Sequence, residues 1–250
     1  MNERKHWDNI GERYNDEIFD VFASDRLGLL PKYFQKHANK KSVAFDFGCG
    51  NGKAFRFLSP LFKEVIGADI SENLLKQASR RGFNNAQVHQ ADLTRPVKKS
   101  WRADFVFSCN VIMLPKLEAN YKMLRNVSGI LKRGGSAVVV VPSAESIMYS
   151  GWRLIDWYRR EGVKAEKIDP DDLGYFKGTR PEIVQGLFYI DGVPTKHFSA
   201  PEIEVIFSEA GLKVTTLEKL EYKWDTEFAE PPSWMKAPYP WDWLIECRKS

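Results

Sequence analysis

Apolar residues in the first forty positions recur at helical spacing. They are Ile18, Val21, Phe22, Leu27, Leu29, Leu30, Tyr33 and Phe34. Because residues three and four positions apart share one face of a helix, this spacing predicts two or three amphipathic helices over residues 1–40.

The pattern changes at Val43, where short apolar runs begin to alternate with segments of helical spacing. Strands are predicted at Val43–Phe47, Val65–Asp69, Ala86–His89, Asp104–Ser108 and Ser136–Val141. Helices are predicted between them at Lys53–Phe62, Ser71–Arg81 and Lys116–Leu131, the last of which ends at Gly134-Gly135. A chain that alternates in this way builds a doubly wound parallel sheet with helices on both faces. Ligands of such a fold bind beyond the carboxyl ends of the strands.

The alternation of strands and helices stops at residue 142 and returns at residue 199. Residues 142–198 hold an aromatic-rich helix and a segment dense in Gly, Pro and Asp, which we interpret as an insertion that caps the acceptor side of the ligand crevice. Residues 199–250 predict one helix followed by two strands. The chain, 1–250, is therefore expected to form a single domain in which N-terminal helices (1–40) precede a ligand-binding core (41–141).

Three glycines at alternate positions, Gly48, Gly50 and Gly52, connect the first predicted strand to the next helix. Glycine lets the backbone turn tightly or approach a ligand closely. A dinucleotide-binding loop would have its third glycine where Lys53 stands, and a P-loop would have Ser or Thr where Ala54 stands. The spacing therefore argues against both of these phosphate-binding loops.

The segment Asp46-Phe-Gly-Cys-Gly-Asn-Gly52 resembles the first motif of the class I S-adenosylmethionine (SAM)-dependent methyltransferases, an acidic residue followed by GxGxG. Further landmarks of that family follow in order at Asp69, Ala91–Leu93, Ser108–Val111 and Leu131–Gly135. The resemblance covers about residues 43–141. It implies an α/β fold with a doubly wound, seven-stranded, mostly parallel sheet whose last strand is antiparallel, with N-terminal helices and a cap insertion before the last helix.

The resemblance also assigns SAM-binding roles, and S-adenosylhomocysteine (SAH) is then the product. The residues are Asp46, Gly48, Cys49, Gly50, Asp69, Ile70, Ala91, Asp92, Leu93, Cys109, Asn110 and, near the N-terminus, Tyr14. Asp69 corresponds to the acidic residue that holds the ribose hydroxyls in the family, and Asp92 to the segment that contacts the adenine. A carboxylate suits the ribose because it accepts charge-assisted hydrogen bonds from both hydroxyls.

Two residues carry open alternatives. His197 stands just before the predicted last helix, at a junction that borders the acceptor pocket in many small-molecule members of the family. It is a candidate catalytic base or acceptor ligand, or else a histidine bonded to the backbone at a helix start. Tyr14 falls where many family members place a tyrosine that closes over SAM, and a helix residue packed on the core would show the same pattern.

Composition and charge limit the remaining classes of partner. Lys and Arg exceed Asp and Glu by 37 to 33, a formal charge of +4, and they do not gather in one segment, which argues against a nucleic-acid partner. The longest apolar run, Ala137–Val141, is far too short to cross a bilayer, and the N-terminus lacks the apolar core of a signal peptide. Three cysteines without paired spacing predict free thiols, a cytoplasmic location and no metal site.

The insertion contains many Trp, Tyr and Phe residues, and such side chains can wall an apolar pocket. We therefore expect a methyltransferase that acts on a small or medium organic molecule. Asn110 opens no Asn-Pro-Pro-Tyr type of motif, because Val111 follows it, which argues against that subclass of amino methylation. The alternatives are a methyltransferase that acts on tRNA or protein, and a SAM-binding module without catalysis.

Overall fold

The computed structural model of the chain describes residues 20–249. Its main element is a seven-stranded sheet with the order β3-β2-β1-β4-β5-β9-β8. The strands are β1 (Asn39–Phe47), β2 (Phe62–Asp69), β3 (Ala86–Gln90), β4 (Ala103–Cys109), β5 (Leu131–Pro142), β8 (Leu212–Glu221) and β9 (Trp241–Lys249). The pairs from β3 to β5 are parallel, whereas β9 is antiparallel to both β5 and β8. The predicted mostly parallel sheet with an antiparallel last strand is confirmed.

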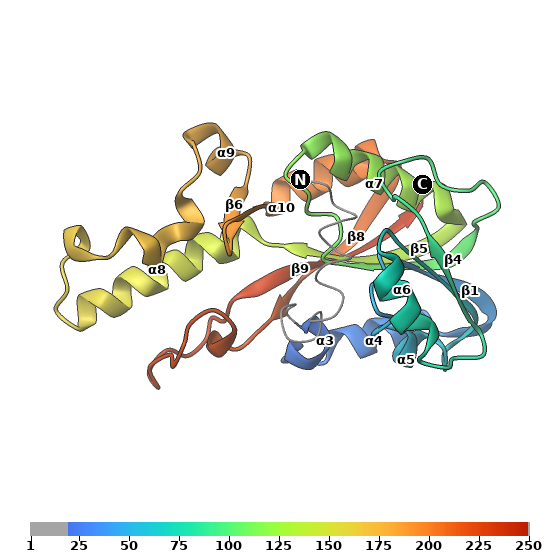
Figure 1. Ribbon diagram of the computed structural model, residues 1–250, viewed down its shortest axis with the longest axis horizontal. Helices are drawn as coiled ribbons and strands as arrows, with labels where there is room; N and C mark the ends of the chain where they lie inside the picture. Colours follow the sequence, from blue (N-terminus) through green and yellow to red (C-terminus); the bar gives the residue numbers. More distant parts are fainter. Residues whose placement is uncertain (1–19, 250) are drawn as a thin grey trace.

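Helices cover both faces of this sheet (Figure 1). They are α3 (Val21–Ser24), α4 (Leu29–Lys36), α5 (Phe55–Leu58), α6 (Glu72–Ser79), α7 (Leu117–Ile130) and α10 (Ala200–Glu209). Buried side chains of α7 and α10 form one hydrophobic cluster with the sheet, and those of α3, α4, α5 and α6 form another. The sheet therefore lies between two layers of helices, as the alternation along the chain predicts.

The valine run of β5 shows why this strand lies inside the sheet. Successive side chains of a strand point to opposite faces. Val138 and Val140 accordingly pack in the cluster of α4, α5 and α6, while Val139 and Val141 pack in the cluster of α7 and α10. Each of these four valines is at most 1% exposed to solvent. Burial of a valine side chain stabilises a fold by about 1.5–3 kcal/mol.

Two predicted helix bounds differ from the structure. The helix expected at residues 53–62 is only the four-residue α5, and β2 already begins at Phe62. Pro60 explains the short helix, because its nitrogen carries no hydrogen to donate to the carbonyl of Arg56 and so cannot continue the helix beyond Ser59. The pair Gly134-Gly135 lies within β5 rather than at the end of α7, and it occupies a register shift in which Gly134 has a φ of 76°.

The insertion projects from the sheet as an arm (Figure 1). It contains α8 (Ala144–Arg160), the short 3-10 helices η1 (Ala165–Lys167) and η2 (Pro170–Phe176), α9 (Arg180–Val184), and a hairpin of β6 (Leu187–Ile190) and β7 (Val193–Lys196). The hairpin is absent from the sequence prediction, although its turn, Asp191-Gly192, is a typical hairpin dipeptide. Both turn residues have positive φ, 48° and 79°.

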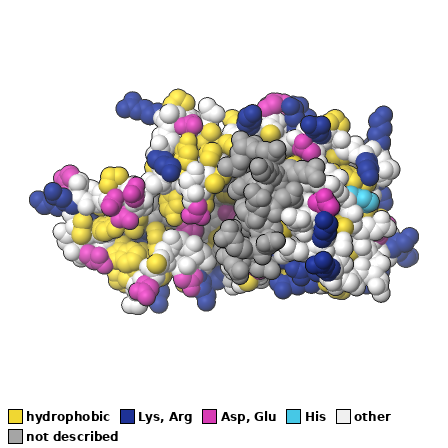
Figure 2. All heavy atoms as spheres, in the orientation of Figure 1, with side chains coloured by type: hydrophobic (Ala, Val, Ile, Leu, Met, Phe, Trp, Pro, Cys, Tyr) yellow, Lys and Arg dark blue, Asp and Glu magenta, His cyan; other side chains and the backbone are white. Residues whose placement is uncertain are grey.

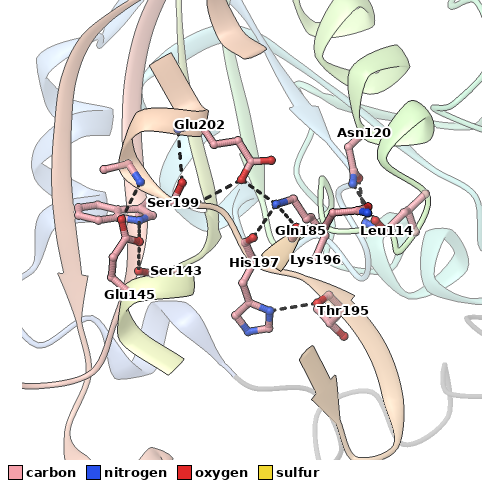
Figure 3. Close-up of polar contacts among 12 residues, drawn as sticks. Leu114, Asn120, Ser143, Glu145, Gln185, Thr195, Lys196, His197, Ser199 and Glu202 are labelled. Carbon is pink, nitrogen blue, oxygen red and sulfur yellow. Dashed lines mark hydrogen bonds and ion pairs between the residues drawn. The ribbon is translucent and has the colours of Figure 1, made fainter. Parts of the chain in front are cut away.

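Lys196 anchors one end of the arm (Figure 3). Its side chain is 1% exposed. The ammonium donates to the carbonyls of Gln185 and His197 at 2.7 and 2.8 Å and to the carboxylate of Glu202 at 2.7 Å. A buried charge is tolerated only when it is paired in this way, so these contacts fix β7 against the start of α10.

Glu145, in the first turn of α8, anchors the other end. Its carboxylate accepts hydrogen bonds from the backbone N–H of Ala200 at 2.8 Å and from the indole N–H of Trp243 at 3.1 Å. The arm therefore leaves and rejoins the sheet at two points tied to α10 and β9.

Ser199 caps helix α10. Its hydroxyl accepts from the backbone N–H of Glu202, whose carboxylate accepts from the backbone N–H of Ser199, which is a capping box. We expect Ser199→Ala to lower the free energy of unfolding by about 1 kcal/mol, measured by urea unfolding. Ser208→Ala, at an exposed position of the same helix, is the matched control. Equal losses in the two variants would contradict the capping role.

Candidate functional site

The glycine loop leaves β1 at the edge of the sheet where the parallel strands end. Gly48, Gly50 and Gly52 have φ values of 78°, 50° and 76°, a region that favours glycine over other residues. A Cβ atom at Gly48 would lie 2.2 Å from the Cγ2 atom of Val111. The loop thus packs directly on the segment after β4, and only glycine fits at position 48 without displacing that segment.

Asp69, the last residue of β2, holds the glycine loop. Its Oδ2 atom accepts from the backbone N–H of Gly50 at 2.9 Å, and its Oδ1 atom accepts from the backbone N–H of Ser71 at 2.9 Å. The backbone N–H of Ala91 donates to the carbonyl of Asp69 at 2.8 Å. The loop and the ends of β2 and β3 therefore meet at Asp69, where the resemblance puts the SAM ribose.

Asp46, near the end of β1, is a buried carboxyl with an unsatisfied oxygen. It is 3% exposed, and its Oδ2 atom accepts no hydrogen bond from any described residue. Burial, and then the negative charge of Asp69, raise the pKa of the Asp46 carboxyl from 3.8 to about 8. Such an oxygen is ready to accept from a cationic or hydrogen-bond-donating ligand.

A cavity of about 910 Å³ opens beside the glycine loop and reaches the arm. Its walls come from the ends of β1 and β4, from α8 and η2, from the β6–β7 hairpin and from the segments that flank β8 and β9. They include Asp46, Gly48, Cys49, Cys109, Asn110, Ser146, Tyr175, Thr195, His197, Tyr222, Glu227, Trp241 and Asp242. The volume lies in the range of small-molecule sites and leaves room for an acceptor beside a methyl donor.

The predicted SAM residues divide between this cavity and the adjoining sheet edge. The residues that line the cavity are Asp46, Gly48, Cys49, Cys109 and Asn110. Gly50 lies next to them through its bond to Asp69, and Ile70 is half-buried directly after that residue. Tyr14 lies outside the residues that the structure describes.

Asp92 and Leu93 follow β3 and do not line the cavity. The Oδ1 atom of Asp92 accepts from the backbone N–H and the hydroxyl of Thr94 at 3.0 and 2.6 Å, and its Oδ2 atom lies 3.1 Å from Nε of Arg95. Leu93 is 6% exposed and belongs to the hydrophobic core. A local turn thus accounts for the contacts of Asp92, and its role toward the adenine stays a prediction.

The geometry of this edge fits SAM, which carries a sulfonium, an ammonium and a ribose diol. The unsatisfied Oδ2 atom of Asp46 and the tight approach at Gly48 suit the charged methionine end. The carboxylate of Asp69 lies beside the glycine loop, where the resemblance puts the ribose, and its role toward the ribose stays a prediction. When bound, SAM supplies an electrophilic methyl group, and these residues would orient that group toward the cavity.

Asn110 links the SAM side of the cavity to strand β9. It follows β4 with a φ of 52°. Its Nδ2 atom donates to Oδ2 of Asp242 at 3.1 Å, and the hydroxyl of Tyr222 donates to the same oxygen at 2.8 Å. Burial raises the pKa of the Asp242 carboxyl against these two hydrogen bonds, which lower it. The Oδ1 atom of Asn110 is buried and accepts no hydrogen bond from the described residues.

His197 lines the cavity between β7 and α10. Its Nδ1 atom donates to the carbonyl of Thr195 at 3.1 Å, and the ring points away from the Lys196–Glu202 pair (Figure 3). Burial lowers the pKa of the imidazole to about 4, the Thr195 bond opposes this, and the charge of Lys196 lowers it further. The ring is therefore neutral at pH 7, with Nε2 left as a hydrogen-bond acceptor. His197 thus has the backbone bond of the structural alternative and also lines the cavity, and its role as a base or acceptor ligand stays a prediction.

Glu227 and Asp242 line the same cavity and were missed by the sequence analysis. Glu227 follows the 3-10 helix η3 (Trp224–Thr226), and its backbone N–H donates to the carbonyl of Trp224 at 3.1 Å. Burial raises the pKa of the Glu227 carboxyl to about 7, the Ser150 hydroxyl opposes this, and the charge of Asp242 adds to it. An aspartate inside an apolar strand could have indicated Asp242, whereas no sequence pattern indicates Glu227.

Comparison with known proteins identifies the class. Residues 45–139 match a family model described as a methyltransferase domain. A SAM-dependent methyltransferase from Anabaena variabilis superimposes with a TM-score of 0.65 at 14% identity, covering 100% of this chain and 96% of that one. Magnesium protoporphyrin IX methyltransferase from Synechocystis, solved with bound SAH, gives 0.62 at 14% identity, covering 99% and 98%. The matched domain and the shared fold confirm the predicted resemblance to the class I SAM-dependent methyltransferases, and with it the predicted fold, enzyme class and cofactor.

Curated relatives add information on acceptors. A mouse protein named tRNA (carboxymethyluridine(34)-5-O)-methyltransferase ALKBH8 is 34% identical over 191 residues, which are 73% of this chain and 26% of that protein. A yeast protein named probable S-adenosylmethionine-dependent methyltransferase CRG1 is 29% identical over 153 residues, 53% of this chain and 50% of that protein. The chain thus spans between a quarter and a half of the length of these relatives.

The expectation that argued against a nucleic-acid partner is corrected by these relatives. Proteins from Arabidopsis, macaque and yeast carry the same tRNA methyltransferase name as the mouse protein. An even spread of basic residues is therefore a poor guide here, because a tRNA-binding surface can be assembled from separate segments or from another part of a longer protein. In the described part of the chain, no helix is long and apolar enough to cross a membrane.

Proposed function

We propose that this methyltransferase modifies a nucleotide of tRNA. The observation that carries the proposal is the extent of the likeness to the mouse tRNA methyltransferase. It covers 73% of this chain, far more than residues 45–139 that match the general methyltransferase domain. The likeness therefore includes segments outside the SAM-binding core.

The cavity supports an extruded base as the acceptor. Enzymes that modify a base take it out of the stack and into a pocket, where aromatic side chains stack on it. Tyr175 and Trp241 line the cavity on the acceptor side. Trp152, on α8, is 55% exposed and stacks on Tyr149 with ring centroids 5.9 Å apart, which offers a second aromatic surface on the arm.

A small organic acceptor is a second candidate, favoured by the charge of the cavity. Among the described lining residues, the acidic ones are Asp20, Asp46, Asp191, Glu227 and Asp242. The only Lys or Arg among them is Lys53, whose Nζ atom lies 2.9 Å from Oδ2 of Asp20. On the face drawn in Figure 2, Lys and Arg side chains are dispersed rather than gathered. The acidic cavity lining favours a cationic small molecule, because a cleft lined by charges of one sign concentrates ligands of the opposite sign.

Transfer of labelled methyl from SAM tests the two candidates. The enzyme is incubated with intact total tRNA, with the same tRNA digested to nucleosides, and with a metabolite extract. We expect label in intact tRNA and its loss after digestion. Label confined to the metabolite extract would replace the tRNA proposal with the second candidate.

His197 is expected to contact the acceptor through its Nε2 atom. His197→Ala should raise the KM for the labelled acceptor about fivefold, because one hydrogen bond to a buried group is worth about 1 kcal/mol. The Kd for SAM, measured by calorimetry, should not change. The control is His89→Ala, a half-buried histidine of β3 outside the cavity lining. A KM unchanged in both variants would leave His197 with a structural role only.

A further inference from the structure

We propose that the acceptor side of the cavity binds a basic amine, and that the carboxylate of Glu227 takes a proton from its nitrogen. The acceptor side is the wall formed by Tyr175, His197, Glu227, Trp241 and Asp242. The inference rests on the proposed function only in requiring an acceptor. It applies equally to an amine on a tRNA nucleotide and to an amine on a small molecule.

The fold sets the positions of the Asp242 and Glu227 carboxyls. Asp242 is near the start of β9, and its Oδ2 atom is held by Asn110 and Tyr222 at 3.1 and 2.8 Å. Asn110 belongs to the methionine side of the cavity, so Asp242 lies between that side and the acceptor side. Glu227 enters from the loop between β8 and β9, close enough to Asp242 for their charges to interact.

Two residues that line the cavity each carry a buried oxygen that lacks a partner and needs a hydrogen-bond donor. Oδ2 of Asp46 and Oδ1 of Asn110 are buried and accept no hydrogen bond from the described residues. Asp46 is 3% exposed and lines the cavity, so an unpaired ionised form would be costly. SAM can satisfy the Asp46 oxygen, so Oδ1 of Asn110 is the one that a methyl acceptor with only hydrogen-bond acceptor atoms would leave unsatisfied.

The charge of the cavity calls for a second cation in addition to SAM. The ammonium and sulfonium of SAM account for the negative charge near Asp46. The negative charges of Glu227 and Asp242 on the acceptor side are not balanced in this way. Among the residues that the structure describes, no Lys or Arg lines the cavity beside them. The described carboxylates, cysteines and histidines also form no group of three or more that could hold a metal ion. A protonated amine supplies both the positive charge and the N–H donors.

The same charges disfavour a carboxylate as the acceptor. The tRNA relatives are named for carboxymethyluridine, whose carboxyl group is an anion at neutral pH. An anion placed next to Glu227 and Asp242 would be repelled. We therefore infer that this chain methylates a different chemical group from the one in the names of those relatives.

The reaction balances with Glu227 as the proton acceptor. The bound ammonium gives one proton to the Glu227 carboxylate, which frees the lone pair of the nitrogen. That lone pair forms the bond to the methyl carbon as the methyl–sulfur bond breaks, the electron pair of the broken bond stays on sulfur, and SAH leaves. The product is a methylated ammonium. The raised pKa of Glu227, about 7, suits a base that works near neutral pH.

The stability of the transferred label in alkali tests the chemical class of the acceptor. Product from the fraction that takes up label, intact tRNA or metabolite extract, is treated with mild alkali. A methyl ester of a carboxylate releases volatile methanol, whereas an N-methyl group stays on the product. We expect alkali-stable label that binds to a cation exchanger. Volatile label would overturn the inference, while the fraction that takes up label separately decides the tRNA proposal.

Binding of two probes tests the acidic wall itself. Phenethylamine and phenylacetate are titrated into SAH-loaded enzyme by calorimetry. We expect phenethylamine to bind at least about tenfold more tightly, which corresponds to about 1.4 kcal/mol. Equal binding of both probes, or binding of neither, would overturn the inference.

Glu227→Gln tests the role of this residue, and Glu230→Gln, exposed in the same loop, is the matched control. Glu227→Gln should reduce the preference for phenethylamine, because only Asp242 remains on that wall, and lower the rate of label transfer at least about a hundredfold, with the Kd for SAM unchanged. Its melting temperature should not fall, because the change removes a buried charge. The control should behave as wild type. A full rate of transfer in Glu227→Gln would exclude the proton-accepting role.

Discussion

Asp69→Ala is expected to weaken SAM binding at least about tenfold. Each charge-assisted hydrogen bond to a carboxylate is worth about 1.5–3 kcal/mol, and the family resemblance predicts that both ribose hydroxyls donate to Asp69. The change also removes the acceptor of the Gly50 and Ser71 backbone N–H groups. The glycine loop then loses its contact with the end of β2, which adds to the loss. Calorimetric titration with SAM measures the effect.

Glu64→Ala is the control for Asp69→Ala. Glu64 is an acidic residue of the same strand, toward its other end, and it is absent from the cavity lining. Glu64→Ala should leave the affinity for SAM unchanged, whereas Asp69→Ala should lower it. An unchanged affinity in Asp69→Ala would place the ribose elsewhere.

SAM binding is expected to strengthen with rising pH between pH 6 and 8 through Asp46. Because its pKa is raised to about 8, the free enzyme holds this carboxyl mostly protonated at pH 6. The positive charges of SAM favour the ionised form, so binding releases a proton. The ionised fraction falls about fiftyfold from pH 8 to pH 6 for a pKa of 8, and the affinity should fall by a similar factor.

Asp46→Asn supplies the control for this pH dependence. The asparagine cannot ionise, so the affinity of the variant should be nearly independent of pH and no proton should be released. Calorimetry in two buffers of different ionisation enthalpy measures the proton release directly. A wild-type affinity that stayed flat from pH 6 to 8 would contradict the prediction.

The stability of the free enzyme should change with pH in the opposite direction. The pKa of Asp46 is higher in the folded state than its ordinary value of 3.8, so protonation favours the folded state. The favourable effect is complete below about pH 4 and is lost as the pH rises through about 8. Folding therefore favours the protonated form of the Asp46 carboxyl, whereas SAM binding favours its ionised form.

Local patterns predicted the core of the fold well. The strands of residues 41–141 and the helix at 71–81 were found within a few residues, because buried parallel strands and amphipathic helices leave strong periodic patterns. The predicted elements were wrong in two segments where glycine occurs, because glycine can end a helix, form a bulge in a strand or form the turn of a hairpin. Gly134-Gly135 was interpreted as a helix end but occupies a bulge of β5, and the Asp191-Gly192 turn was hidden in a segment interpreted as irregular.

The site was predictable only in part. The glycine loop and Asp69 form a motif within one stretch of chain, so the sequence alone indicated them. Glu227 and Asp242 come from the loop and strand that close the sheet. Asp242 gains its importance by lying beside Asn110, more than a hundred residues earlier, and Glu227 by lying near Asp242. The sequence shows their charge but not their burial, and burial is what raises their pKa values.

The sequence by itself determined the class of fold, the family and the methyl donor, because these depend on periodic burial and on a contiguous backbone motif. The tertiary structure alone decided that five acidic residues and His197 share one cavity, and that His197 is neutral there. The physical reason is that charge interactions and desolvation depend on distance in space. That information is absent from a linear pattern until the chain has folded.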